Sequence, residues 1–191
     1  MGIKRYSLPA SLACLLLFYA AVATATSIPR LSFEQLVDES DAVVSGTVTR
    51  TWSEWDAAHQ FIWTRALIAV ASTHKGAASK TALVSELGGQ VDGRGMAVAG
   101  SPRYIAGESV LVFLKNYPGL GYRTLGWGQG RYELDASGKI HGAATSGDLQ
   151  VVSLTASKAG TALSSLDNIT LRELNVKIAG RLNQVRIGSV K

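Results

Sequence analysis

The stretch that decides the fold is VLVFL, residues 110–114, which follows a glycine-rich segment running from Gly88 to Gly107. A short and continuous apolar run bounded by turn residues is typical of a strand that is buried on both faces. Gly107 and Glu108 supply the turn that leads into it. The stretch therefore predicts a strand inside a sheet, with other elements covering both of its faces.

Runs of strand-forming residues bounded by turn residues predict further strands on both sides of this stretch. They are rich in Val, Ile, Thr and aromatic residues and cover residues 42–55, 60–73, 81–87, 121–127 and 131–134, with a short strand at 139–141. Gly46 lies inside the first of them and predicts a bulge or a sharp bend. Strands separated by turns every 8–12 residues or so are typical of a small barrel. The predicted fold is mainly β (α+β), a closed or partly open β-barrel with a helix at each end.

Two capping boxes predict those helices. Ser32 and Gln35 precede a short helix over residues 33–40, and Thr170 and Glu173 open a C-terminal amphipathic helix. The second helix carries an apolar stripe at helical spacing, which we expect to dock on the barrel. The stripe consists of Leu171, Leu174, Ile178, Leu182 and Val185.

The first 25 residues have the pattern of a cleaved signal peptide. Lys4 and Arg5 precede an apolar stretch over residues 8–22, and Ala23-Thr24-Ala25 provides the small residues of a cleavage site. We therefore expect an exported protein, periplasmic or secreted, that begins at Thr26 and has no transmembrane anchor. The predicted organisation is a signal peptide (1–25), a β-barrel domain (26–142), a Ser/Ala/Thr/Gly-rich crossing segment (143–165) and the C-terminal helix (166–191).

Composition excludes several classes of function. The one cysteine, Cys14, lies in the leader, so the mature chain has no disulfide, thiolate metal site or cysteine nucleophile. Removing the leader takes away Lys4 and Arg5, which leaves 17 basic against 14 acidic residues and a net charge of +3. This charge is mild, and no Lys/Arg stripe alternates with aromatic residues, so we expect no nucleic-acid partner.

The glycine-rich segment does not match a nucleotide-binding loop. Gly88 and Gly93 have the spacing of a P-loop, but Arg94 and Gly95 stand where the Lys and the hydroxyl residue belong, and no helix pattern follows. The histidines, His59, His74 and His141, lack the close spacing of metal ligands. We therefore predict no cofactor and no metal, and we expect the glycines to turn corners between strands.

Two alternative functions remain open. Glu86, Asp92 and Glu108 offer carboxylates for a hydrolase with an unrecognised acid/base pair, although their spacing does not demand one. The tryptophans offer the aromatic surface of an oligosaccharide binder. These residues are Trp52, Trp55, Trp63 and Trp127.

The order of motifs resembles a family of uncharacterised exported bacterial proteins. The residues that carry the resemblance are Asp41-Ala42-Val43-Val44, Gly46, Val48, Thr64, His74-Lys75-Gly76, Gly88-Gly89, Val91, Gly93, Gly100, Pro102, Gly107-Glu108, Val110-Leu111, Phe113-Leu114, Gly126 and Gln129-Gly130. The resemblance implies an OB-like barrel similar to that of tissue inhibitors of metalloproteinases, and a co-exported partner such as a metalloprotease. Those inhibitors chelate the protease zinc through an N-terminal cysteine, which the mature chain lacks.

These observations favour a non-enzymatic binding module over an enzyme, and we predict no catalytic residue. The expected partner is a protein, such as a secreted protease, or a component of the cell envelope. We predict that the binding surface consists of Gly88, Gly89, Gly93, Arg103, Trp127, Gln129 and Arg131.

Overall fold

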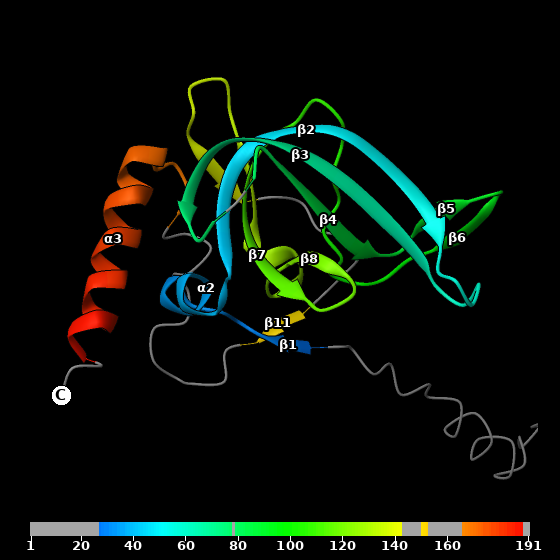
Figure 1. The fold of residues 1–191 in the computed structure, drawn as a ribbon, viewed down its shortest axis with the longest axis horizontal. Helices are drawn as coiled ribbons and strands as arrows, with labels where there is room; N and C mark the ends of the chain where they lie inside the picture. Colours follow the sequence, from blue (N-terminus) through cyan, green and yellow to red (C-terminus); the bar gives the residue numbers. More distant parts are fainter. Residues whose placement is uncertain (1–26, 78, 143–149, 153–165, 189–191) are drawn as a thin grey trace, which may run out of the picture.

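The computed structural model describes residues 27–77, 79–142, 150–152 and 166–188; the predicted signal peptide and most of the predicted crossing segment lie outside them. The described chain is mainly β (Figure 1). Its elements are β1 (Ser27–Pro29), α2 (Phe33–Glu39), β2 (Ala42–Trp55), β3 (Ile62–Lys75), β4 (Thr81–Leu87), β5 (Gly89–Val91), β6 (Arg94–Met96), β7 (Ser109–Tyr117), β8 (Gly121–Thr124), the 3₁₀ helix η1 (Trp127–Gly130), β9 (Arg131–Leu134), β10 (Ile140–Gly142), β11 (Gln150–Val152) and α3 (Leu171–Gly188).

Five strands of the main sheet pair into a ring. The sheet runs in the order β10-β9-β7-β2-β3-β4-β8, and β7 also pairs with β8, so β2, β3, β4, β8 and β7 close on themselves. The pairs of this sheet are antiparallel except β4 with β8, which run parallel and share one residue pair, Val84 with Tyr122. We call this junction the seam. It is the least hydrogen-bonded part of the ring, and the candidate site lies beside it.

The bend predicted at Gly46 is present. The register of β2 against β3 shifts between Ser45 and Gly46, and a Cβ at Gly46 would collide with the carbonyl oxygen of Ala69. Glycine is therefore required there by the close approach of the two strands as β2 curves around the ring.

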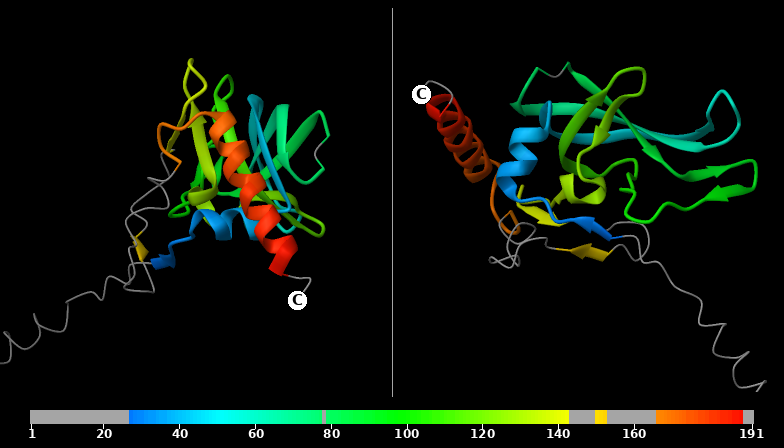
Figure 2. Two further views of the ribbon diagram at one scale, coloured as in Figure 1. Left: turned by 90° about the vertical axis from the view of Figure 1, so that its left-hand side faces the viewer. Right: turned by 90° about the horizontal axis from the view of Figure 1, so that it is seen from below.

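The strand predicted to be buried on both faces is β7, and its buried side chains alternate between two cores. Val110, Val112 and Leu114 pack inside the ring with residues of β2, β3 and β4. Leu111 and Phe113 face outward and pack with α2, α3, β9 and β10. Figure 2 shows that both helices cover the same side of the ring, so β7 separates an inner core from an outer one.

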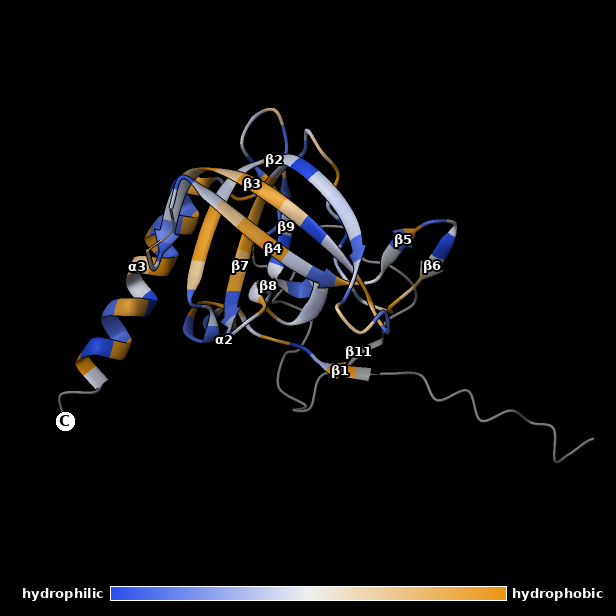
Figure 3. Ribbon diagram, turned by 45° about the vertical axis from the view of Figure 1, so that its right-hand side comes forward, coloured by the Kyte–Doolittle hydropathy of each residue, from blue (hydrophilic) through white to orange (hydrophobic). Residues whose placement is uncertain are grey.

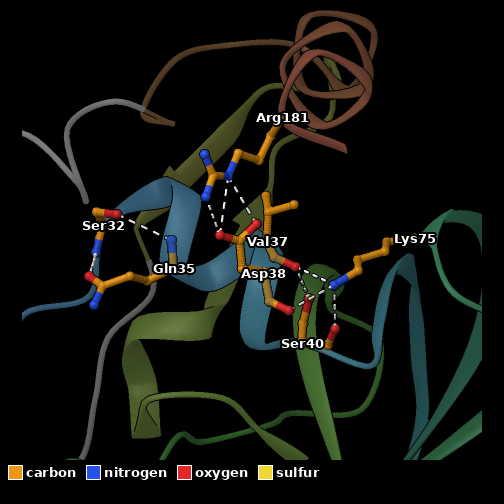
Figure 4. A network of polar contacts seen from close by, with 7 residues as sticks. All are labelled: Ser32, Gln35, Val37, Asp38, Ser40, Lys75 and Arg181. Atoms are coloured by element: carbon orange, nitrogen blue, oxygen red, sulfur yellow. Dashed lines mark hydrogen bonds and ion pairs between the residues drawn. The ribbon is translucent and has the colours of Figure 1, made fainter. Parts of the chain in front are cut away.

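Helix α2 is fastened at both ends (Figure 4). Its predicted capping box is present: the Ser32 hydroxyl accepts from the backbone N–H of Gln35, and the Gln35 side chain accepts from that of Ser32. At the other end the Lys75 ammonium donates to the carbonyl oxygens of Val37, Asp38 and Ser40. These carbonyls have no partner within the helix, so a cation from β3 stabilises its C-terminus.

Helix α3 docks on the outer core by only the first part of its predicted stripe. Leu174 and Ile178 are buried and Leu171 is partly buried, but Leu182 and Val185 are 38% and 46% exposed. The prediction that the whole stripe is buried is therefore wrong for its last two residues, which lie in the part of α3 that extends past α2 (Figure 1).

Candidate functional site

A cleft of about 640 Å³ opens at one end of the ring, beside the seam. It lies between the end of β4, the hairpin formed by β5 and β6, and the loop that leads to β7. The hairpin projects from the ring at this end (Figure 3). The cleft is lined by Thr64, Glu86–Gln90, Gly95–Val98 and Ser101–Ile105. Gly88, Gly89 and Arg103 of the predicted surface therefore do lie together.

The glycines shape this cleft by turning the chain. Gly88 and Gly89 have φ of +104° and +140°, and a Cβ at Gly89 would lie 2.5 Å from the Thr64 hydroxyl oxygen, so a side chain would push the hairpin away from β3. Gly93, with φ of +75°, forms the tip of the hairpin and has open space around it. The elements that follow these glycines are the strands β5, β6 and β7.

The floor of the cleft is the buried carboxyl of Glu86. Its Oε1 accepts a 2.7 Å hydrogen bond from the backbone N–H of Thr124 on β8. Because the backbones of β4 and β8 share only one residue pair, this side chain supplies a bond across the seam that the ladder does not. Burial raises the pKa of Glu86 to about 7, and the hydrogen bonds from Thr124 and the charge of Arg123 oppose the rise.

The far wall of the cleft is held by Arg131. Its guanidinium forms ion pairs with Glu108 at 2.6 Å and Glu133 at 3.1 Å and lies over the ring of Tyr104. Glu108 in turn accepts a 3.0 Å hydrogen bond from the N–H of Ile105. These residues, which we call the Arg131 network, connect β9 to the loop that forms the wall.

Two residues of the predicted surface are not on it. Arg131 is 2% exposed, and Gln129 is 6% exposed because its amide bonds the N–H of Leu31 and the carbonyl of Pro29. The prediction that they form part of an exposed binding face is wrong. Both side chains hold distant parts of the chain together, and their partners could not be identified from their neighbours in the sequence.

Trp127, by contrast, belongs to a surface cluster that was not predicted as a whole. The guanidinium of Arg123 on β8 lies 5.3 Å from the ring centre of Trp63, 5.8 Å from that of Trp127 and 5.9 Å from that of Tyr117. We call these four residues the Arg123 cluster. Arg123 also faces the seam, since its Nη2 lies 3.9 Å from Oε2 of Glu86. The alternation of Tyr122, Arg123 and Thr124 was the one signal in the sequence that could have indicated an outward arginine.

The three carboxylates considered for a hydrolase have three different environments. Glu86 bonds Thr124, Glu108 pairs with Arg131, and Asp92 is exposed in the turn of the hairpin. The charge that acts on Glu86 comes from Arg123 and not from a second carboxylate. Glu86, Asp92 and Glu108 therefore do not share a bonding partner among the described residues.

Within the described ranges no group of three or more His, Cys, Asp or Glu side chains is arranged to hold a metal ion. No helix there has the length and apolar character needed to cross a membrane. Comparison with protein-family models, curated proteins and solved structures finds no match for this chain.

Proposed function

We propose that this chain is an exported, non-enzymatic module that binds a protein partner through the Arg123 cluster and the adjoining cleft. We also propose that its ring is an OB-like barrel. The ring order β2-β3-β4-β8-β7, with a return to β2 and one parallel pair between β4 and β8, supports this description. Export is supported by the signal-peptide pattern of residues 1–25.

The observation that carries the proposal is the composition of the cluster. Trp, Tyr and Arg are the residue types that contribute most energy to protein interfaces, because they offer a large contact area and polar groups together. Here Trp63, Trp127, Tyr117 and Arg123 gather within 6 Å of one guanidinium at the surface, beside a cleft. Tyr117 is 43% exposed, so a partner can reach the cluster.

The same cluster argues against a ligand that stacks on aromatic rings. Sugars and nucleobases bind tryptophan through a free ring face. A guanidinium lies over Trp63, over Trp127 and, from Arg50, over Trp52, and so covers a face of each. On the faces that the guanidinium groups cover, an oligosaccharide or a nucleic acid would have to displace these arginines before it could stack.

A hydrolase remains the second candidate, because Glu86 is a buried carboxyl with a pKa of about 7 at the floor of a cleft. Such a group is suited to proton transfer near neutral pH. It bonds the backbone of β8, however, and so has a structural task already. Loss of a hydrolytic activity in a folded Glu86→Gln variant would favour this candidate.

The resemblance to metalloproteinase inhibitors suggests the first partner to test. The predicted mature chain has no cysteine and therefore cannot inhibit a protease through an N-terminal cysteine. Contact with a protease would have to use another surface. The Arg123 cluster and the hairpin lie at the same end of the ring as the cleft, and they offer that surface.

The proposal is tested by titrating the purified protein with the catalytic domain of a matrixin-type metalloprotease, a cell-wall oligosaccharide and single-stranded DNA. We expect saturable binding of the protein probe alone. Trp127→Ala should weaken it roughly tenfold or more, as at an interface hot spot. Trp52→Ala is the matched control, since Trp52 lies under Arg50 outside the cluster. Oligosaccharide binding that is lost in Trp127→Ala would contradict the choice of a protein ligand.

A further inference from the structure

Arg123 leaves its hydrogen-bonding capacity unused. A guanidinium has five N–H donors and no acceptor. Arg123 forms no hydrogen bond with any described residue, and its Nε is buried without a partner. The 3.9 Å between its Nη2 and Oε2 of Glu86 is longer than a hydrogen bond. The side chain is nevertheless only 23% exposed, so much of its hydration has been removed.

Two other arginines of this fold have closer carboxylate partners, although the Nε of Arg131, like that of Arg123, is buried without a hydrogen-bond partner. Arg65 also lies over Trp63, but it pairs with Glu54 at 2.8 Å and donates to the hydroxyl of Ser85. Arg131 is more deeply buried and has two carboxylate partners. The ion pair of Arg123 with Glu86, at 3.9 Å, is longer than those of Arg65 and Arg131 and includes no hydrogen bond.

Glu86 is a weak counter-ion for Arg123. Its Oε1 is bonded to the N–H of Thr124, and burial keeps its pKa near 7, so that the carboxyl is partly neutral at neutral pH. Arg123 is the last and smallest of the causes that act on that pKa. A strong ion pair would instead hold the pKa of the carboxyl well below its ordinary value.

We infer that Arg123 is a receptor for a carboxylate, supplied by an acidic side chain that the partner protein inserts among Trp63, Tyr117 and Trp127. The inference rests on the proposed protein-binding function and names the chemistry that the partner must bring. A carboxylate matches the fork of a guanidinium with two parallel hydrogen bonds, which are roughly twice as strong as neutral ones. The three rings around the fork would exclude water and pack against the apolar stem of the acidic side chain.

The inference is tested with a small carboxylate in place of the unidentified partner. Phenylacetate carries a carboxylate on an apolar stem, and phenylacetamide has the same shape without the charge. Nuclear magnetic resonance of the isotope-labelled protein follows the Nε–H of Arg123 and the indole N–H of Trp63 and Trp127. We expect phenylacetate to shift these signals saturably and phenylacetamide to leave them in place. Equal shifts with both compounds would overturn the inference, since charge would then play no part.

Two variants and one further probe identify the group responsible. Arg123→Lys keeps the charge but loses the fork, and we expect roughly tenfold weaker binding of phenylacetate. Arg65→Lys is the matched control on the same tryptophan, and we expect unchanged binding. Undiminished binding by Arg123→Lys, or tighter binding of inorganic phosphate than of phenylacetate, would overturn the assignment.

The two proposals fail in different ways. If Trp127→Ala weakens binding of the protein probe while phenylacetate leaves the signals of Arg123 unmoved, the surface binds a protein but the carboxylate assignment is wrong. If phenylacetate binds at Arg123 while the protein probe does not, the receptor stands and the choice of partner is wrong.

Discussion

Arg131 and Arg123 lie near the same hydrogen-bonded pair, Tyr104 and Thr124, but the two guanidinium groups differ in their contacts. Tyr104 and Thr124 share a 2.6 Å hydrogen bond between their hydroxyl groups. On one side Arg131 lies over the Tyr104 ring with two carboxylate partners. On the other side Glu86 accepts from Thr124 and faces Arg123, which has no hydrogen bond to the described chain. The Nε of each arginine is buried without a hydrogen-bond partner, but the Nη groups of Arg131 bond two carboxylates while those of Arg123 bond no described residue.

We propose that the difference separates an arginine that stabilises the fold, Arg131, from one that binds a partner, Arg123. Leaving a buried donor unsatisfied costs about 1–3 kcal/mol; Arg131 offsets this cost through two carboxylate partners, whereas Arg123 has no hydrogen bond to a described residue. Contacts with Trp63, Tyr117 and Trp127 return part of that free energy.

The largest effect is expected from Arg131→Gln. The change leaves the carboxylates of Glu108 and Glu133 without their cation and removes the guanidinium that lies over Tyr104. Removing one partner of a buried ion pair costs about 3–5 kcal/mol, and the partial exposure of both carboxylates favours the lower end. The free energy of unfolding in urea measures the loss. A change below about 1 kcal/mol would show that the Arg131 network does not support the fold.

Glu86→Gln tests the residue between the two arginines. Since the pKa of Glu86 is about 7 in the fold against an ordinary 4.5, the folded state retains a proton that the unfolded state loses between these values. Stability should therefore fall as the pH rises from about 5 to about 8, by on the order of 3 kcal/mol. Carboxyls with lowered pKa, such as Asp41 and Glu54, act below this range.

The variant should remove this decrease, because a glutamine side chain at this position does not ionise and can still accept from the N–H of Thr124. Urea unfolding at several pH values compares the two proteins. If the wild-type protein instead gains stability over the same range, Glu86 is ionised against Arg123, and that arginine has a counter-ion after all.

Tyr132→Phe measures how much an unpaired, buried hydroxyl group lowers the free energy of unfolding. The Tyr132 hydroxyl is buried in the outer core without a hydrogen-bond partner, and its ring packs edge-on against Phe113. Removing the hydroxyl should stabilise the protein by about 1 kcal/mol. Tyr104→Phe is the matched control, because that hydroxyl bonds Thr124 and its removal should destabilise. Thermal melting of both variants reports the difference in sign.

The parts of the fold that could be predicted depend on local signals. The capping boxes at Ser32 and Thr170 use residues three positions apart, and the apolar run of β7 is contiguous. The length of the docked part of α3 could not be predicted, because its stripe continues beyond the surface that receives it. The strands of the hairpin β5–β6 were not predicted, because they are three residues each and rich in glycine.

The candidate site was predicted in part, and for a similar reason. The glycine-rich segment is visible in the sequence, so Gly88 and Gly89 could be predicted as part of the candidate surface. In the structure both have positive φ and line the cleft. Gln129 is bonded to Leu31, 98 positions away, and Arg131 to Glu108, 23 positions away, so their burial follows from tertiary contacts. Arg123 meets Trp63 only because the ring brings β8 beside β4 and β3. The spacing of these residues in the sequence does not indicate that they are neighbours in the fold.

The central claim, that Arg123 is present for binding and not for the fold, is tested most directly by the free energy of unfolding of Arg123→Gln beside that of Arg131→Gln. Both variants make the same substitution, and urea unfolding at neutral pH measures both. Our account predicts that Arg123→Gln lies within about 1 kcal/mol of the wild-type protein, since the lost contacts with the rings offset the relief of an unpaired guanidinium. A loss of about 3 kcal/mol or more, equal to that of Arg131→Gln, would contradict it and make Arg123 a structural residue.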